Sequence, residues 1–190
     1  RRLRHRAARD VELAAIADGT VVTASAEMRA MARSVAADAA RGQTLVELKA
    51  VDNVYPLYGA MALSPEMPLD EALATQGGVP GLVVEPNLLT RLGVDIGEQV
   101  RIGDTDFELR ATIIRDPDRV ADVFALGPRA MISRAALAGT GLVQPGSLVE
   151  YHYLVRLPAA ARTSADISTW VASLNQRFPA AGRPPPHRRL

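Results

Sequence analysis

The chain has 190 residues, of which 48% are hydrophobic and 23% charged, values typical of a folded globular protein with a sizeable core. Its formal net charge of +1 conceals an uneven distribution: residues 1–10 contain five arginines and one acid, residues 183–190 contain three arginines, and 14 basic and 20 acidic residues remain over 11–182. An acidic body disfavours a nucleic-acid-binding surface, and the lack of cysteine excludes disulfides and thiolate chemistry.

The N-terminal part begins with a helical pattern and continues with two strand patterns. Apolar residues at helical spacing predict a helix over residues 3–17, with its arginines on the solvated face. From Thr20 to Arg33 the period changes to two, as in a half-buried strand. A turn at 38–43 separates it from a second strand over 44–52, and we expect the two strands to pair as a long hairpin.

The middle of the chain consists of short elements separated by glycine and proline. We expect a short helix at about 69–75, a strand in GLVVEP, and a helix in NLLTRLGV with Asn87 as N-cap and Gly93 as its stop. The alternation on either side of GDTD, in GEQVRIGDTDFELRATII, predicts a β-hairpin. RAMIS then predicts a short strand and RAALAGTG a short helix.

Longer elements return near the C-terminus. The sequence SLVEYHYLVRL (147–157) alternates as a strand, and SADISTWVASLNQRF (164–178) has one apolar helical face with Ser164 as N-cap. Three consecutive prolines follow, which exclude a helix or a central strand. No apolar run approaches the roughly 20 residues that cross a bilayer, so we expect a soluble fragment without transmembrane helices.

This contrast between long and short elements predicts an α+β fold with two lobes. Residues 1–55 and 149–180 are expected to form one discontinuous α/β lobe from both chain ends. Residues 56–148 are expected to form an inserted lobe, mainly β with short helices. Residues 181–190 are predicted to be a disordered tail.

The sequence shows no pattern of residues that indicates catalysis. It contains no G-x-G-x-x-G, no P-loop and no G-x-S-x-G elbow. None of the three histidines has metal-ligand spacing, and we interpret His152 as a structural or surface residue. Asp116, Asp118 and Asp122 lack the further ligands of a calcium loop, so we interpret them as a solvated acidic turn. We therefore expect a binding or mechanical module, not an enzyme, without cofactor or metal.

The candidate site is the corner that follows the second strand. There Pro56 fixes φ and cannot donate to a sheet, and Gly59 permits a turn that other residues resist. The chain leaves the flanking lobe at this corner and returns at about 147–150, so we predict that tyrosines of the two crossings pack together. An inter-lobe joint or partner surface is therefore expected at Tyr55, Pro56, Leu57, Tyr58, Gly59, Tyr151 and Tyr153. A ligand-reading role for the corner is the alternative.

Four segments carry a resemblance to a known family. In chain order they are QTLVELKAVDNVYPLYG, LLTRLGVDIGEQVRIGDTDFELRATI, DRVADVFALGPRAMIS and TGLVQPGSLVEYHYLVRLP. Together they resemble the extracytoplasmic domain of MacB/FtsX-like ABC transporter permeases, closest to the YbbP-like branch, over residues 20–179. The resemblance implies a porter-like α/β lobe with an inserted, mostly β lobe, as in the MacB periplasmic domain. The family's lobe begins with a strand before its first helix, and no such strand is evident in this sequence.

The resemblance also implies a location and a function. Such a domain lies on the extracytoplasmic side of the bacterial inner membrane. It would couple ATP-driven movement of membrane helices to export or release of a hydrophobic or lipid-like substrate, or to an extracytoplasmic partner protein. The partner that supplies energy would be a cytoplasmic ABC ATPase subunit, reached through the membrane part. The alternatives are a free-standing soluble binding or adaptor module and a lipid hydrolase, which would need a serine–base pair within hydrogen-bond reach.

Overall fold

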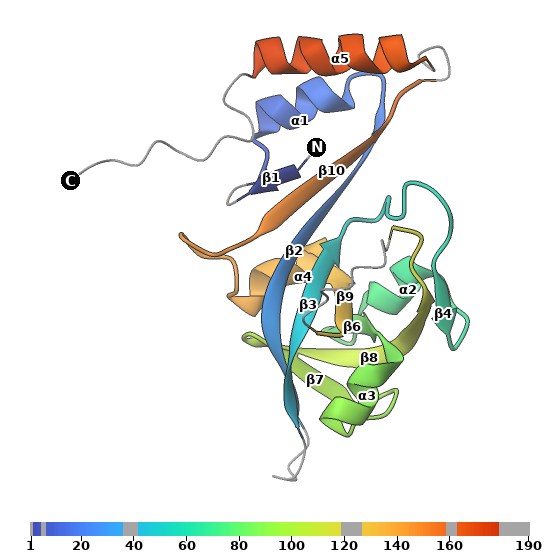
Figure 1. The fold of residues 1–190 in the computed structure, drawn as a ribbon. Helices are drawn as coiled ribbons and strands as arrows, with labels where there is room; N and C mark the ends of the chain where they lie inside the picture. The colour runs from blue at the N-terminus through green and yellow to red at the C-terminus, as the bar shows by residue number, and fades with distance from the viewer. Residues whose placement is uncertain (1, 5–6, 36–41, 119–126, 159–162, 179–190) are drawn as a thin grey trace, which may run out of the picture.

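A twisted sheet of ten strands dominates the fold (Figure 1). The computed structural model describes residues 2–4, 7–35, 42–118, 127–158 and 163–178. The strands are β1 (Arg2–Arg4), β2 (Val21–Ser34), β3 (Gln43–Val51), β4 (Ala62–Ser64), β5 (Thr75–Gln76), β6 (Val79–Val84), β7 (Gln99–Ile102), β8 (Thr105–Arg115), β9 (Arg129–Ser133) and β10 (Glu150–Arg156). The helices are α1 (Asp10–Ala17), α2 (Leu69–Leu73), α3 (Pro86–Leu92), α4 (Arg134–Leu137), the 3-10 turn η1 (Ala138–Thr140) and α5 (Ser164–Arg177).

The predicted long hairpin is confirmed as β2 and β3. The two strands pair antiparallel from Ser25 opposite Val51 to Arg33 opposite Gln43. One face of β2 is buried or half-buried along the whole strand, and the strand is buried on both faces only at residues 23–26. β2 is long enough to serve two neighbours on its other edge, pairing with β10 along its first half and with β7 at its end.

The lower part of the sheet closes on itself. β2 pairs with β3, β3 with β9, β9 with β6, β6 with β8, β8 with β7, and β7 with β2 again. Alternate side chains of these strands point inward and form the largest part of the main hydrophobic core, which includes Leu48, Leu82, Ile102, Phe107 and Ile132. The predicted hairpin around GDTD is confirmed as β7 and β8.

The upper part is an open sheet of β1, β10 and β2 under α1, with α5 lying beyond α1 in Figure 1. Tyr151 and Tyr153 of β10 belong to the main core, and the Tyr153 hydroxyl accepts a hydrogen bond from the Ala8 N–H at 2.8 Å. Within the described ranges, no helix is long and apolar enough to span a bilayer.

The prediction of one helix over residues 3–17 is wrong in its first half. Residues 2–4 form β1, which pairs antiparallel with β10, so the strand that the family places before its first helix is present. The helix begins only at Asp10, where the Glu12 carboxylate accepts a hydrogen bond from the Arg9 N–H at 2.8 Å. Helical periodicity alone does not detect a three-residue strand, whose existence depends on a distant partner edge.

Two predicted N-caps are also wrong. The helix α3 begins with Glu85 as N-cap and Pro86 as its first residue, not with Asn87, although Gly93 ends it in the left-handed conformation as predicted. The helix α5 is capped by Thr163, whose hydroxyl accepts from the Asp166 N–H while the Asp166 carboxylate accepts from the Thr163 N–H. The predicted tail, residues 181–190, lies outside the described residues.

A second, smaller hydrophobic cluster lies outside the closed strands, beneath α2 and β4, and includes Val51, Tyr55, Leu73, Val83 and Met131. β2 and β3, which were assigned to the flanking lobe, also pair with β7 and β9 from the middle of the chain. The division into lobes at residues 55–56 and 148–149 stays a prediction.

Candidate functional site: a polar ladder across the sheet

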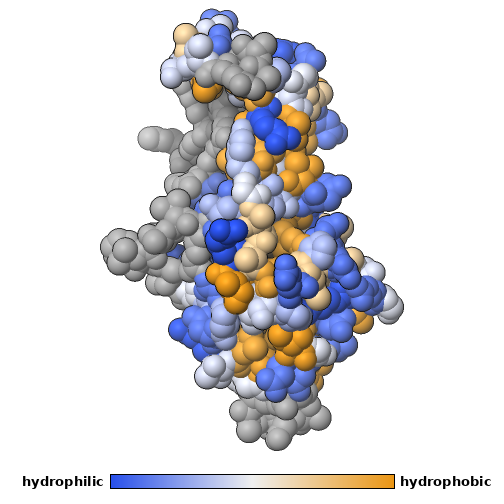
Figure 2. Space-filling model, turned by 90° about the vertical axis from the view of Figure 1, so that its right-hand side faces the viewer, coloured by the Kyte–Doolittle hydropathy of each residue, from blue (hydrophilic) through white to orange (hydrophobic). Residues whose placement is uncertain are grey.

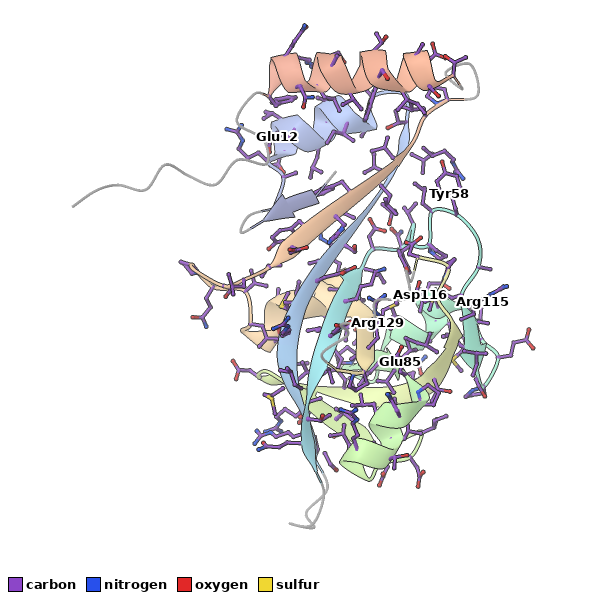
Figure 3. All side chains as sticks on the ribbon, in the orientation of Figure 1. Glu12, Tyr58, Glu85, Arg115, Asp116 and Arg129 are labelled. Carbon is purple, nitrogen blue, oxygen red and sulfur yellow. The ribbon has the colours of Figure 1, made fainter. Side chains whose placement is uncertain are left out.

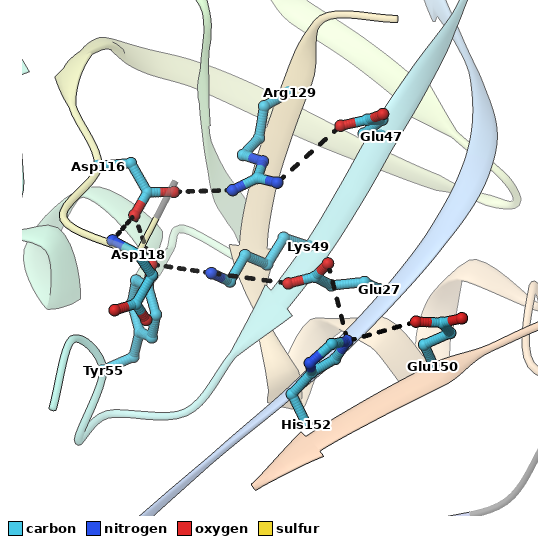
Figure 4. Close-up of polar contacts among 9 residues, drawn as sticks. All are labelled: Glu27, Glu47, Lys49, Tyr55, Asp116, Asp118, Arg129, Glu150 and His152. Carbon is cyan, nitrogen blue, oxygen red and sulfur yellow. Dashed lines mark hydrogen bonds and ion pairs between the residues drawn. The ribbon is translucent and has the colours of Figure 1, made fainter. Parts of the chain in front are cut away.

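Charged side chains form a connected row on one face of four neighbouring strands (Figure 4). We call this row the polar ladder; its members are Glu27, Glu47, Lys49, Tyr55, Asp116, Arg129, Glu150 and His152. Strand register brings most of them together, because directly opposed residues share a face of the sheet. Glu150 of β10 lies opposite Glu27 of β2, and Glu27 lies opposite Lys49 of β3.

Lys49, the only lysine of the chain, stands at the centre of the ladder. Its side chain is 5% exposed, and its ammonium donates a hydrogen bond to the Tyr55 hydroxyl at 2.8 Å. The same ammonium lies 3.7 Å from a Glu27 carboxylate oxygen and 4.2 Å from the centre of the Tyr55 ring. Burial lowers the pKa of Lys49, although the charges of Asp116 and Glu27 oppose this shift.

Asp116, just after β8, provides the negative charge deepest in the ladder, with a side chain that is 1% exposed. It accepts hydrogen bonds from the Tyr55 hydroxyl at 2.6 Å, from the Arg129 guanidinium at 2.9 Å and from the Asp118 N–H at 3.0 Å. Burial alone would raise the pKa of Asp116, but the Tyr55 hydrogen bond and the Lys49 charge together hold it below its ordinary value. Burial and this hydrogen bond to Asp116 raise the pKa of Tyr55.

Arg129, the first residue of β9, extends the ladder along the neighbouring strand. Besides its bond to Asp116, its guanidinium lies 3.9 Å from the Glu47 carboxylate, in agreement with the register that places Glu47 opposite Arg129. Its backbone N–H donates to the Glu85 carboxylate at 3.0 Å. The end of β8, the start of β9 and the outer face of β3 are therefore held together by charge-assisted bonds.

His152 connects the ladder to the upper sheet. Its Nε2 atom lies 3.9 Å from a Glu27 oxygen and 3.7 Å from a Glu150 oxygen. Because Glu27 also faces Lys49, the row runs without interruption from β10, through β2 and β3, to the end of β8 (Figure 4). The ladder positions strands, and removing a buried member such as Asp116 leaves Arg129 and Lys49 less compensated in low dielectric. No group of three His, Asp or Glu side chains in the described parts of the chain is arranged to hold a metal ion.

The predicted joint residues do not gather in one place. Tyr55 is part of the ladder and of the smaller hydrophobic cluster, and Leu57 is buried, whereas Tyr58 is 58% exposed and points outward (Figure 3). The Tyr55–Pro56 peptide is cis, and Gly59 has a φ of 74°.

Tyr151 and Tyr153 lie in the main core, on the opposite face of β10 from His152. Tyr55, whose hydroxyl bonds to Lys49 on the ladder face, therefore belongs to the other side of the sheet. The structure does not bring Tyr55 and these two tyrosines into one cluster, and an inter-lobe role for the seven residues stays a prediction.

The sequence analysis missed most of the ladder. The interpretation of Asp116 as part of a solvated acidic turn is wrong, because its side chain is buried and accepts three hydrogen bonds. Its partners come from β3, β9 and the Tyr55 corner, which are distant in sequence. One signal was available: the lone lysine occurs in LVELKAV, a pattern otherwise typical of a buried strand.

The surface on the Tyr58 side of the molecule carries hydrophobic residues interspersed with polar ones (Figure 2). The exposed large apolar residues of the described chain include Val54, Tyr58, Ile114 and Leu154.

The fold is that of the extracytoplasmic domains of ABC-type transporters. The extracellular domain of the ABC-type transporter YknZ from Gram-positive bacteria matches with a TM-score of 0.56 and 13% identity, over 91% of this chain and 85% of that one. The periplasmic region of MacB from Actinobacillus actinomycetemcomitans matches with a TM-score of 0.50 and 11% identity, over 85% of this chain and 68% of that one.

In sequence, the chain is similar to the uncharacterized ABC transporter permease YbbP of Escherichia coli (strain K12), with 33% identity over 109 residues. These residues are 57% of this chain and 13% of the permease, so the chain spans only a small part of the length of this curated relative. No family profile matches the sequence. The structural comparisons confirm the expected α+β, MacB-like fold, and the sequence similarity agrees with the resemblance to ABC transporter permeases.

Proposed function

We propose that the chain is a non-catalytic domain through which an ABC permease transmits the movement of its membrane helices to the extracytoplasmic side. The observation that carries this proposal is the polar ladder, which joins the upper sheet to the closed strands through buried and partly exposed polar side chains. Among the described residues, the first strand, β1, and the last helix, α5, both belong to the upper part of the molecule (Figure 1). A displacement applied there would reach the closed strands along β2 and β3, which run through both parts.

The ladder makes this transmission stiff. Sliding β10 against β2, or β3 against β9, would separate Glu27 from His152 or Arg129 from Glu47. Separating partly buried charges costs more than separating exposed ones, because water does not fully replace the lost partner. The two parts would therefore move together, as one near-rigid body with the strand registers preserved, and contacts between this domain and its surroundings would change.

The energy and the cargo come from outside this chain. The sequence carries no phosphate-binding loop, so a separate cytoplasmic ABC ATPase would supply the energy through the membrane part. A hydrophobic or lipid-like substrate, or an extracytoplasmic partner protein, would receive the movement. The exposed apolar residues on the Tyr58 side provide a surface of suitable chemistry for either.

A non-catalytic role is supported by the use of three of the described serine hydroxyls. The Ser133 hydroxyl caps α4 by accepting from the Ala136 N–H, and the Ser147 and Ser168 hydroxyls donate to backbone carbonyls. These hydroxyls serve local backbone structure, whereas a hydrolase nucleophile must be paired with a base.

The proposal is tested by spin-label distance measurements on the full-length permease with its ATPase in liposomes. Cysteines at exposed positions of the upper part (Asp18→Cys) and of the closed-strand part (Asp70→Cys) carry the labels, and a third label marks the outer end of a neighbouring membrane helix. We expect ATP to change the distance from both positions to the membrane label and to leave the Asp18–Asp70 distance almost constant. Identical distances with and without ATP would refute transmission through this domain, and a change at Asp18 alone would refute stiffness.

A further inference from the structure

We infer that the outer face of the β2–β3 hairpin, at the end away from α1 and α5, is a docking surface for an acidic, amphipathic segment of a partner protein. We call this surface the arginine patch; it consists of Arg29, Met31 and Arg33 of β2, Leu45 of β3 and Arg101 of β7. Figure 1 shows β2 and β3 running from the upper part of the molecule to its opposite end. At about 3.3 Å per residue, Met31 lies about 33 Å along β2 from Val21, the first residue of the strand.

The centre of the arginine patch is an apolar pair. Met31 and Leu45 are directly opposite each other on the two antiparallel strands, so their side chains are neighbours on one face of the sheet. Met31 is 48% exposed and Leu45 is 37% exposed. They share the face of the polar ladder, because Met31 follows Glu27 by four residues and Leu45 precedes Lys49 by four. A partner can therefore reach this pair without any rearrangement of the sheet.

Arginines flank the apolar pair on both sides along β2. Arg29 precedes Met31 by two residues and Arg33 follows it by two, so the three side chains share one face of the strand. Both arginines are exposed. The two guanidinium groups therefore frame an accessible apolar contact.

One of these arginines faces a like charge on the neighbouring strand. Arg33 is directly opposite Arg101 of β7, and like charges in this arrangement destabilise a sheet. The Asp106 carboxylate of β8 accepts two hydrogen bonds from Arg101. These bonds, with a smaller effect from the charge of Arg33, lower the pKa of Asp106. One carboxylate thus serves two guanidinium groups, and an acid supplied by a partner would relieve the remaining repulsion.

The same ratio of charges occurs where the patch meets the polar ladder. Glu47 of β3 is opposite Arg29 on one side and Arg129 on the other. With the three charges of the other row, the described residues around the apolar pair include four arginines and two acids, an excess of two positive charges. Residues 11–182 as a whole have 14 basic and 20 acidic residues, so the patch is a local exception in an acidic body. Charge complementarity therefore identifies an acidic partner.

The apolar pair adds that the partner carries apolar residues between its acids. Arginine and methionine are enriched in protein interfaces, and methionine adapts its shape to a partner. Arg29 and Arg33 are about 13 Å apart along the strand. A helix with acids at i and i+7 and apolar residues at i+3 and i+4 places its carboxylates about 10.5 Å apart on one face, within reach of two long arginine side chains. The inference deepens the proposed function, on which it rests, because such a partner would receive the movement transmitted along β2 and β3.

The test measures binding of a helical probe peptide, containing the pattern Glu-Ala-Ala-Leu-Leu-Ala-Ala-Glu, to the 190-residue chain by fluorescence anisotropy. Arg29→Gln combined with Arg33→Gln removes both flanking charges and should weaken binding about fivefold or more. Met31→Thr combined with Leu45→Thr keeps the charges and should weaken binding about tenfold. All four positions are exposed, so circular dichroism should show both double variants folded.

Arg115→Gln combined with Arg177→Gln is the matched control, because it removes the same charge from two exposed arginines of β8 and α5. It should leave the affinity within about twofold of the wild type. A probe with lysine in place of glutamate should bind about tenfold more weakly than the acidic probe.

Equal affinities of the wild type and the variant with both flanking arginines replaced would overturn the inference, and so would an equal loss in the matched control. Vesicles of phosphatidylglycerol and phosphatidylethanolamine provide the remaining comparison. If these vesicles bind the patch and the peptide does not, the protein partner is rejected in favour of an anionic lipid surface.

These measurements need no ATPase or membrane-embedded permease, so their failure would leave the transmission experiment unaffected. Conversely, binding of the probe with ATP-independent distances in the permease would retain the docking surface and reject only the proposed function.

Discussion

Replacing Asp116 by asparagine removes the deepest negative charge of the ladder with almost no change in shape. The carboxylate accepts from the Tyr55 hydroxyl, the Arg129 guanidinium and the Asp118 N–H, at 2.6, 2.9 and 3.0 Å. In Asp116→Asn one oxygen becomes an NH2 donor, which cannot accept from Tyr55 or Arg129. The substitution therefore leaves Arg129 and Lys49 less compensated without creating a cavity.

The size of the loss follows from burial and from the remaining partners. Removing one member of a buried ion pair costs about 3–5 kcal/mol. The lower end applies here, because Arg129 keeps Glu47 at 3.9 Å and Lys49 keeps Glu27 at 3.7 Å. We expect Asp116→Asn to lower the free energy of unfolding by about 3 kcal/mol, or the melting temperature by about 6–12 °C for a chain of this size.

Urea titration followed by circular dichroism measures this loss directly, with thermal unfolding as a second readout. Asp18→Asn is the matched control, since Asp18 is an exposed aspartate at the end of α1 and should change stability by less than about 0.5 kcal/mol. A loss below about 1 kcal/mol for Asp116→Asn, similar to that of an exposed ion pair, would show that the ladder does not behave as a buried network.

Three further predictions concern pH, an arginine and a glycine. Because the folded-state pKa of Asp116 is below its ordinary value, the stabilisation by this carboxylate is complete above about pH 4–5 and is lost in more acidic solution. In urea titrations, the free energies of unfolding of the wild type and Asp116→Asn should therefore converge below about pH 4. Arg110→Lys should cost about 2–3 kcal/mol in urea unfolding, since a lysine cannot reproduce the guanidinium bonds to three backbone carbonyls and to Glu108; a loss below 1 kcal/mol would contradict this role. Gly81→Ala should destabilise by about 3 kcal/mol in the same assay, because its Cβ would lie 1.9 Å from the Ala72 carbonyl oxygen; near-wild-type stability would show that α2 moves away at little cost.

Sequence periodicity predicted the strands in which the local alternation of apolar and polar residues already defines the buried face. The alternation in β2 and β3 and the turn between β7 and β8 each define a buried face locally, and these pairings are confirmed. β1 was missed because three residues contain too little periodicity, and its partner β10 lies almost 150 residues away. The cap of α5 was displaced by one residue because Thr163 and Ser164 are both good capping residues.

The ladder was less predictable than the fold. Its members come from β2, β3, β9, β10 and the segments that follow β3 and β8. Most of them meet only because strands distant in sequence pair, β10 with β2 and β3 with β9. Asp116 illustrates the difficulty, because an aspartate in RDPD has the local sequence of an exposed turn. Its burial follows from Tyr55 and Arg129, which pack over it from other parts of the chain.

The closed circuit of strands also constrains the order in which the chain can fold. The β2–β3 hairpin is local and can form early, but β2 completes its other edge only with β7 and β10, which are synthesised much later. Pairing across such long sequence separations is slow, because loop-closure entropy is lost before the contacts form. Until β10 arrives, the first half of β2 keeps an unpaired edge that is open to other chains. A nascent domain of this topology therefore depends on its last strand, so truncation before residue 150 should produce aggregation instead of a smaller folded domain.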